Sequence, residues 1–179
     1  AVMFAHNLNM IEFETNFLTI EGPLHAIIEN DLVHLRMPDV TNMMPTEKKD
    51  LFLNTGSPHY VRFVENVENY SILETGKEIR ESNEFAPEGT NVNFVQLKSE
   101  REIFVRTYER GVENETLSCG TGVTASALAF GKNLKKGEVK IMTLGGELTV
   151  RFEQVQKGMF QNIYLIGPAE KVFDGSVLV

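Results

Sequence analysis

The sequence predicts an α/β fold of the α+β type, in which a mixed or mainly antiparallel sheet outweighs the helices. Strand-forming runs outnumber helical ones, and no regular alternation of strand and helix runs through the chain. Glycine-containing and Asn-Asp turns separate several of the strands. With 179 residues, the chain is long enough for one good core, or for two small lobes that share one.

The predicted strands are short runs rich in β-branched and aromatic residues, several with alternating polarity. In chain order they are Glu12–Thr19, Leu24–Ile28, Leu32–Met37, Leu51–Thr55, Tyr60–Glu65, Val92–Lys98, Ile103–Glu109, Glu138–Leu144, Glu147–Glu153 and Met159–Ile166. The turns between neighbouring strands are Glu29-Asn30-Asp31, Gly145-Gly146 and Lys157-Gly158.

Helices are fewer. The sequence predicts one over Thr121–Leu134, a second around Tyr70–Ser82 and a third over the opening Ala1–Leu8. The stretch Asn83–Thr90 contains Pro87 and Gly89 and is predicted to be a loop.

Composition narrows the classes of partner. The net charge of −8 argues against nucleic acid, and the basic cluster Lys132–Lys136 is interpreted as compensation for the dipole of the preceding helix. No apolar run approaches the roughly 20 residues that span a bilayer, and no signal peptide is visible. One cysteine excludes an internal disulfide, and the histidines show no metal-ligand spacing. We therefore expect no metal, no membrane partner and a reducing cytoplasmic setting.

Two stretches of the chain resemble each other. Phe4–Leu8 aligns with Phe130–Leu134, and Thr19–Leu24 aligns with Thr143–Leu148 at nearly the same offset. Both copies then run from a helix end through a strand and a glycine turn into a second strand. The counterpart of Cys119 would fall before Ala1, so we expect the chain to begin inside the first unit.

The most informative motif surrounds the single cysteine. Glu109-Arg110-Gly111 is followed by Thr116–Gly122, which places Cys119 at the start of the predicted helix of small residues. The unpaired N–H groups of a helix N-terminus favour a thiolate and bind anions. A thiol of low pKa beside an anion site suits proton transfer at a carbon next to a carboxylate.

These motifs resemble the C-terminal signature of the diaminopimelate epimerase family. The matching segments are Glu109-Arg110-Gly111, Glu115-Thr116-Leu117, Cys119-Gly120-Thr121-Gly122, Gly56-Ser57-Pro58-His59 and Gly89-Thr90-Asn91-Val92-Asn93-Phe94. The resemblance implies two pseudo-symmetric lobes, each a curved mixed or antiparallel sheet wrapped around a central helix. It also implies a cofactor-independent epimerase, without pyridoxal, that interconverts LL- and meso-diaminopimelate in lysine and peptidoglycan-precursor biosynthesis. One cysteine from each lobe would move the proton, and members are often homodimers.

The resemblance also suggests the domain boundaries. Residues 1–42 would be the remnant of a truncated first lobe, to which residues 168–179 return, and residues 43–167 would form a complete second lobe. The family's first cysteine loop, Cys-Gly-Asn-Gly, is absent from the sequence. We therefore expect this chain to supply one of the two cysteines and to be inactive alone.

By resemblance, three residues would carry the chemistry. Cys119 would remove the α-proton in one direction and return it in the other. Glu109 would meet the α-ammonium group or tune the protonation of Cys119, and His59 would sit near a catalytic thiol.

The resemblance assigns the remaining site residues to substrate binding. Gly120, Thr121 and Gly122 would offer backbone N–H groups to the α-carboxylate. Arg110 would bind the distal carboxylate with its guanidinium fork, and Asn91 would contact the distal amino and carboxylate groups. Ser57 stands where many members have an asparagine, a change that would adjust the contacts to substrate.

Two alternatives stay open at this point. The chain could be a catalytically silent ligand-binding or interaction module of the same fold, or a same-fold isomerase that acts on another acid. A cysteine hydrolase fits less well, because nothing in the sequence pairs a particular histidine and acid with Cys119.

Overall fold

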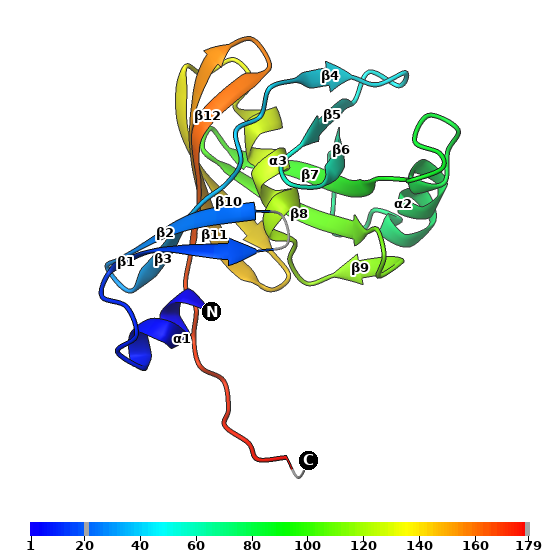
Figure 1. Cartoon of the computed structure of the whole chain (residues 1–179). Coiled ribbons are helices and arrows are strands. Elements are labelled where there is room, and N and C mark those ends of the chain that lie inside the picture. Colours follow the sequence, from blue (N-terminus) through cyan, green and yellow to red (C-terminus); the bar gives the residue numbers. More distant parts are fainter. Residues whose placement is uncertain (20–21, 178–179) are drawn as a thin grey trace.

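Helix α3 (Gly120–Phe130) lies against the concave side of one large sheet in the computed structural model (Figure 1). The structure describes residues 1–19 and 22–177. Within that part of the chain the sheet has 12 strands, in the order β1-β2-β3-β12-β11-β10-β8-β7-β6-β5-β4, with β9 paired to β8. The predicted class, a mixed α/β fold with few helices, is confirmed.

The remaining helices are α1 (Val2–Asn7) and α2 (Ile72–Arg80). The strands are β1 (Glu14–Thr19), β2 (Gly22–Glu29), β3 (Leu32–Arg36), β4 (Met43–Pro45), β5 (Leu51–Asn54), β6 (Pro58–Phe63), β7 (Asn91–Ser99), β8 (Glu102–Glu109), β9 (Asn114–Thr116), β10 (Lys136–Thr143), β11 (Gly146–Gln156) and β12 (Met159–Gly167).

The strand directions explain where the two larger helices lie. Most neighbouring strands are antiparallel, but β6 pairs with β7 in parallel, and β8 pairs with β10 in parallel. A parallel pair needs a crossover connection. Helix α2 lies in the connection from β6 to β7, and α3 lies in the connection from β8 to β10. The register of the first pair sets His59 beside Asn91, which places two predicted site residues on adjacent strands.

Helix α3 is buried on every side. Its residues from Gly122 to Ala129 are all buried, as expected for a helix that is apolar all round. The hydroxyls of Thr124 and Ser126 donate to the carbonyls of Gly120 and Gly122, both at 2.8 Å, so neither polar group is left unpaired in the core. Large side chains of the surrounding strands complete this core, among them Val61, Val95, Ile103, Phe152 and Phe160.

Helix α2 covers a second, smaller cluster on the other face of the sheet. Its buried residues Ile72, Gly76 and Ile79 pack with Tyr60 and Tyr108. A Cβ at Gly76 would lie 2.5 Å from the Cβ of Tyr108, so only glycine allows the helix to come this close to β8.

The structure supports the repeat that the sequence indicates. The β1–β2 and β10–β11 hairpins pair Thr19 with Gly22 and Thr143 with Gly146. In each hairpin the threonine hydroxyl donates to the glycine carbonyl at 2.9 Å, and the glycine has a positive φ, +112° and +132°. The parts of the predicted repeat and tail at residues 20–21 and 178–179 lie outside the described residues. The division into lobes at residues 42 and 167 stays a prediction.

Three local features differ from the prediction. Helix α3 ends at Phe130 rather than Leu134, with Gly131 as its C-cap, and the strand β11 side chain Phe152 packs closely over this glycine. Strands β4 and β9 are not predicted, since three residues are too few to show an alternating pattern.

In the described part of the chain, no helix is long and apolar enough to cross a membrane.

We predict that Gly131→Ala destabilises the protein. An added Cβ would lie 2.1 Å from Cζ of the buried Phe152, so the core must shift, and overpacking of this kind costs about 1–3 kcal/mol. Urea denaturation of both proteins measures the difference in the free energy of unfolding. The matched control is Gly175→Ala, where the nearest atom is 3.8 Å away. Equal effects of the two substitutions would contradict the prediction.

Candidate active site

Cys119 occupies the N-cap position of α3 and is 9% exposed. Its Sγ lies 3.5 Å from the hydroxyl of Thr121, and the amides of Thr121 and Gly122 also point at the sulfur. The N-cap residue faces the unpaired N–H groups of the first helical turn, so the chain places its only thiol where donors converge.

The pKa of the Cys119 thiol is raised, and the low pKa expected from the helix N-terminus is therefore wrong. Burial is the largest cause, and the negative charge of Glu109 adds to it. The hydroxyl of Thr121 and the two amides act in the opposite direction, but they do not compensate for the loss of water around the thiolate. Cys119 therefore carries its proton at neutral pH.

Thr121 links the helix to β6. Its Oγ1 lies 2.9 Å from Nε2 of His59 and 3.1 Å from Oγ of Ser57, and Ser57 Oγ is itself 2.9 Å from the same Nε2. The three groups form a closed triangle beside Cys119. The hydroxyl of Thr55 donates to the Thr121 carbonyl at 2.8 Å, which fixes this turn of the helix to the end of β5.

His59 is fully buried and uncharged at neutral pH. Burial is the main cause that lowers its pKa to about 3, and the positive charge of Arg110 lowers it further. A neutral imidazole has one donor and one acceptor nitrogen, and both are engaged here. Nε2 faces the hydroxyls of Ser57 and Thr121, and Nδ1 lies 3.0 Å from the amide nitrogen of Asn93.

Asn91 joins three segments of the site. Its Nδ2 donates to the Pro58 carbonyl at 2.9 Å and to Ser57 Oγ at 3.3 Å, while its Oδ1 accepts from the Arg110 amide at 2.9 Å. Both N–H donors of this side chain are thus used within the protein. The structure shows how Asn91 holds the site together, and its predicted contact with substrate stays a prediction.

Glu109 and Arg110 lie where β8 ends. The carboxylate of Glu109 accepts a hydrogen bond from the Thr116 hydroxyl at 2.9 Å. The guanidinium of Arg110 donates to the carbonyls of Glu88 and Gly89, at 3.3 and 3.4 Å. These two contacts are long and use a single nitrogen, Nη1, so within the described part of the chain the other donors of the guanidinium stay available for a further acceptor.

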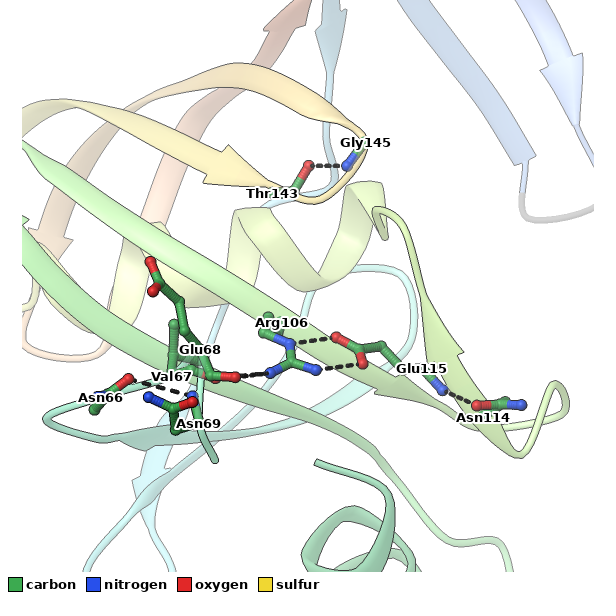
Figure 2. A network of polar contacts seen from close by, with 9 residues as sticks. All are labelled: Asn66, Val67, Glu68, Asn69, Arg106, Asn114, Glu115, Thr143 and Gly145. Atoms are coloured by element: carbon green, nitrogen blue, oxygen red, sulfur yellow. Dashed lines mark hydrogen bonds and ion pairs between the residues drawn. The ribbon is translucent and has the colours of Figure 1, made fainter. Parts of the chain in front are cut away.

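The segment that leads into Cys119 is tethered by Arg106 of β8 (Figure 2). Its Nε and Nη2 donate to the two carboxylate oxygens of Glu115 on β9, at 2.5 and 2.6 Å. Its Nη1 donates to the carbonyls of Val67 and Glu68, at 2.8 and 3.0 Å. Both charged side chains are 17% exposed. This bidentate ion pair holds β9 against β8, and Glu115 lies four residues before Cys119.

Glycines and a carboxylate fix the turns around the site. The amide of Gly145 donates to the Leu117 carbonyl at 2.8 Å, so the β10–β11 turn supports the loop before Cys119. Figure 2 shows the same turn closed by Thr143, whose Oγ1 accepts from the Gly145 amide at 3.2 Å. Glu113 accepts from the Gly111 amide at 2.9 Å and pairs with Arg80, which sets the turn beside Arg110.

Both glycines of the predicted site, Gly120 and Gly122, lie in close packing. A Cβ at Gly122 would lie 2.4 Å from Oδ1 of Asn93 and 3.4 Å from Sγ of Cys119. A Cβ at Gly120 would lie 3.1 Å from the side chain of Leu165. The first turn of α3 therefore packs tightly against β7 at Gly122, where a side chain would force Asn93 to move, and less tightly against β12 at Gly120.

The structure brings together the residues that the sequence singles out. Direct contacts join Ser57, His59, Thr121 and Cys119, and further bonds connect Asn91 and Arg110 to them. Glu109 acts on Cys119 through its charge.

Sequence reasoning missed the polar residues behind the site. These are Thr55, Asn93 and Thr107. The signal was present at β7, where Asn91 and Asn93 alternate with apolar residues in a strand that is buried throughout this stretch.

A separate cavity lies at the other end of α3. It has a volume of about 780 Å³ and surrounds the C-terminal end of α3, where Phe130, Lys136 and Glu153 line it. It contains none of the site residues. Among the described residues, no group of three or more His, Cys, Asp or Glu side chains is placed to hold a metal ion.

Comparison with known proteins identifies the family of this chain. The model of the diaminopimelate epimerase family matches residues 51–172. This chain belongs to the diaminopimelate epimerase family. It is 44% identical, over 98% of its length, to the diaminopimelate epimerase of Flavobacterium psychrophilum, and covers 69% of that protein. The diaminopimelate epimerase of Aquifex aeolicus is 41% identical over 98% of this chain, which covers 66% of it. The chain thus spans about two thirds of the length of these relatives.

Solved structures of low sequence identity share the fold. A phenazine biosynthesis protein of the PhzF family from Bacillus anthracis matches with a TM-score of 0.73 at 12% identity, over 99% of this chain and 73% of its own. A hydroxyproline epimerase from Agrobacterium vitis matches with a TM-score of 0.65 at 18% identity, over 93% of this chain and 61% of its own. These structures show a shared fold with this member of the diaminopimelate epimerase family.

We predict that His59 makes the protein less stable in acid. Its pKa is about 3 in the folded protein and near 6.5 when exposed, so the unfolded chain binds more protons between these values. The stability that depends on neutral His59 is complete above about pH 6.5 and is lost as the pH falls towards 3.

Urea denaturation from pH 7 to 4 tests this against His59→Gln, which does not titrate. The free energy of unfolding of the wild type should fall more steeply than that of the variant, by up to about 1.4 kcal/mol per pH unit. Parallel curves would contradict the prediction.

Proposed function

We propose that this chain supplies one of the two acid–base thiols of a diaminopimelate epimerase, which interconverts LL- and meso-diaminopimelate without pyridoxal. The observation that carries the proposal is the placement of Cys119, a single thiol at the N-terminus of a buried helix. It contacts the hydroxyl of Thr121 and is influenced by the charge of Glu109. Membership of the diaminopimelate epimerase family supports the choice of substrate.

Inversion at a carbon needs a base on one face and an acid on the other. The α-proton of an amino acid is very weakly acidic, so both groups must be held against the substrate with water excluded. The sequence has one cysteine, so in a two-thiol mechanism the second thiol comes from residues outside it. The matched relatives are longer than this chain, which is consistent with such a division.

The raised pKa of Cys119 suits the step in which the thiol donates its proton. A thiol that keeps its proton at neutral pH can donate that proton to a carbanion on its own face. When the reaction runs the other way, Cys119 must be the thiolate. The Thr121 hydroxyl and the amides of Thr121 and Gly122 are the donors that would stabilise that form.

The surrounding groups match the ends of a diamino-dicarboxylate. The N–H groups of Gly120, Thr121 and Gly122 begin a helix of 11 residues and favour the α-carboxylate. Glu109 carries the opposite charge to an α-ammonium group. The free donors of Arg110 suit the distal carboxylate. Recognition at both ends would separate diaminopimelate from ordinary amino acids.

Asn91 and Ser57 stand between these groups and His59. The Ser57 hydroxyl lies 2.9 Å from Nε2 of His59 and accepts a hydrogen bond from Nδ2 of Asn91 at 3.3 Å. We assign it to tuning substrate contacts, with Asn91 reaching the distal groups through its remaining acceptor capacity.

The proposal also includes the division into two lobes, the oligomeric state and the cellular compartment. Residues 43–167 would act as the second lobe, and residues 1–42 with the tail after 167 would belong to the first. The equivalent threonine–glycine hairpins in the two parts support this. A free buried thiol stays reduced in the cytoplasm, and the family resemblance implies a homodimer.

We predict that Cys119→Ala abolishes exchange of the α-proton. The assay follows deuterium uptake from D₂O into diaminopimelate by mass spectrometry. It uses the extended protein, defined as this chain joined to the residues of the Flavobacterium relative that have no counterpart in it. Loss of an acid–base group should lower the rate by roughly 10²–10⁴-fold. The matched control, Ser118→Ala, changes the exposed neighbouring residue and should retain exchange. Retained exchange in Cys119→Ala would rule the proposal out.

We also predict that Arg110→Gln selectively weakens binding of the distal carboxylate. Lysine is diaminopimelate without that carboxylate, so it provides a matched ligand. Calorimetric titration of the extended protein should show a Kd for meso-diaminopimelate raised about 10- to 100-fold, as expected for losing hydrogen bonds to a charged group. The weak binding of lysine should not change. If both ligands lose affinity equally, Arg110 does not read the distal carboxylate.

A further inference from the structure

Asn93 lies behind the site and is fully buried. It sits on β7, two residues after Asn91, so both side chains lie on the same face of the strand. Asn93 lies outside the roles assigned above to catalysis and substrate binding, yet every polar atom of its side chain has a partner. Those partners connect the backbone of β6 to His59.

The contacts fix the orientation of the Asn93 amide. Its Nδ2 lies 3.0 Å from the carbonyl oxygen of Tyr60, which can only accept, so the NH₂ group must face that way. The opposite atom, Oδ1, accepts from the hydroxyl of Thr107 at 3.0 Å. A flipped amide would set two acceptors against each other at Tyr60.

This orientation determines which nitrogen of His59 carries the proton. The second N–H of Asn93 Nδ2 points at Nδ1 of His59, 3.0 Å away, so Nδ1 must be the acceptor. The buried ring is neutral and has one proton, which therefore lies on Nε2.

The Nε2 proton in turn directs the hydroxyls of the site. Nε2 lies 2.9 Å from both Thr121 Oγ1 and Ser57 Oγ. Because Nε2 donates, neither hydroxyl can donate to it. The Thr121 hydrogen then has two acceptors in reach, Ser57 Oγ at 3.1 Å and Sγ of Cys119 at 3.5 Å. Because Ser57 Oγ already accepts from Asn91 Nδ2 and faces the Nε2 proton, the sulfur is the acceptor left for Thr121. In the other tautomer Nε2 would accept, and it would draw a hydroxyl hydrogen away from the sulfur.

We propose that Asn93 is a positioning residue that holds His59 as its Nε2–H tautomer and so directs the Thr121 hydroxyl at the sulfur of Cys119. The relay runs from the Tyr60 carbonyl through Asn93, His59 and Thr121 to the thiol. The proposal rests on the proposed function for its purpose, since directing a donor at Cys119 matters when that thiol moves a proton. Its geometry can be tested without substrate.

The first test is the ¹⁵N NMR spectrum of the histidine rings in the substrate-free wild-type protein, where chemical shifts separate protonated from unprotonated ring nitrogens. His59 is assigned as the signal lost in His59→Gln. We expect unprotonated Nδ1 and protonated Nε2 at pH 7. A protonated Nδ1 would overturn the proposal, and this measurement needs no change at Asn93.

The second test changes the amide. Asn93→Asp replaces the donor with a carboxylate of the same shape, which accepts from Nδ1, so Nδ1 should become protonated. The matched control is Thr107→Val, which removes the partner of Oδ1 but leaves the bonds to Tyr60 and His59, and should keep the wild-type signal. An unprotonated Nδ1 in Asn93→Asp would overturn the proposal.

The third test follows the thiol. The protein has one cysteine, so the rate of alkylation by iodoacetamide at pH 7 reports on Cys119 alone. Thr121→Val should lower this rate about tenfold, the effect of removing a hydrogen bond to a charged sulfur, and Thr121→Ser should restore it.

The double variant decides whether Asn93 acts through Thr121. Asn93→Leu should lower the rate alone, but should add little to Thr121→Val. Additive losses would overturn the relay. Because these readouts use no substrate, a protein that keeps them but fails the deuterium-exchange assay would disprove the proposed function and leave the relay standing.

Discussion

Helix α3 is enclosed by the sheet, and its first turn is where β6, β7 and β8 bring their polar side chains to the thiol. The enclosure depends on small residues, since a Cβ at Gly122 would collide with Asn93 and one at Gly131 would collide with Phe152. Because the packing is this close, the helix cannot shift along its axis without a collision. The location of Cys119 relative to His59 and Glu109 therefore follows from core packing rather than from flexible loops.

Burying a helix N-terminus together with polar side chains is costly unless each group finds a partner. Here the hydroxyls of Thr55, Thr121 and Thr107 and the amides of Asn91 and Asn93 are hydrogen-bonded within the protein. The same bonds tie together the ends of three strands and the helix. The same hydrogen bonds therefore stabilise the fold and hold the side chains of the site in position.

The electrostatics of Cys119 show two opposing effects. The helix N-terminus and its donors favour the thiolate, while burial and Glu109 favour the thiol, and the second pair of effects is stronger. This balance of effects on the pKa of Cys119 applies to the protein without bound substrate. Under the proposed function, the α-ammonium group of the substrate would lie near Glu109, where its charge would offset the effect of Glu109 on the pKa of Cys119 and so favour the thiolate.

The sequence by itself determined the fold class, the buried character of α3 and the motif around Cys119. Each of these is local: a run of small and apolar residues, the hairpin glycines that follow Thr19 and Thr143, and a cysteine directly before a helix. Local patterns survive folding because they reflect short-range backbone geometry and which side chains avoid water. The family resemblance singled out residues in compact motifs, and the structure brings these residues together.

Only the tertiary structure decided the rest. Asn93 and Thr107 reach the site through strand pairing across the sheet, and the parallel register of β6 with β7 sets His59 beside Asn91. The pKa of Cys119 depends on how much water its surroundings exclude, and the C-cap Gly131 of α3 packs against Phe152, 21 residues further along the chain. These outcomes rest on contacts between distant segments, and a pattern read along one stretch of chain does not contain them.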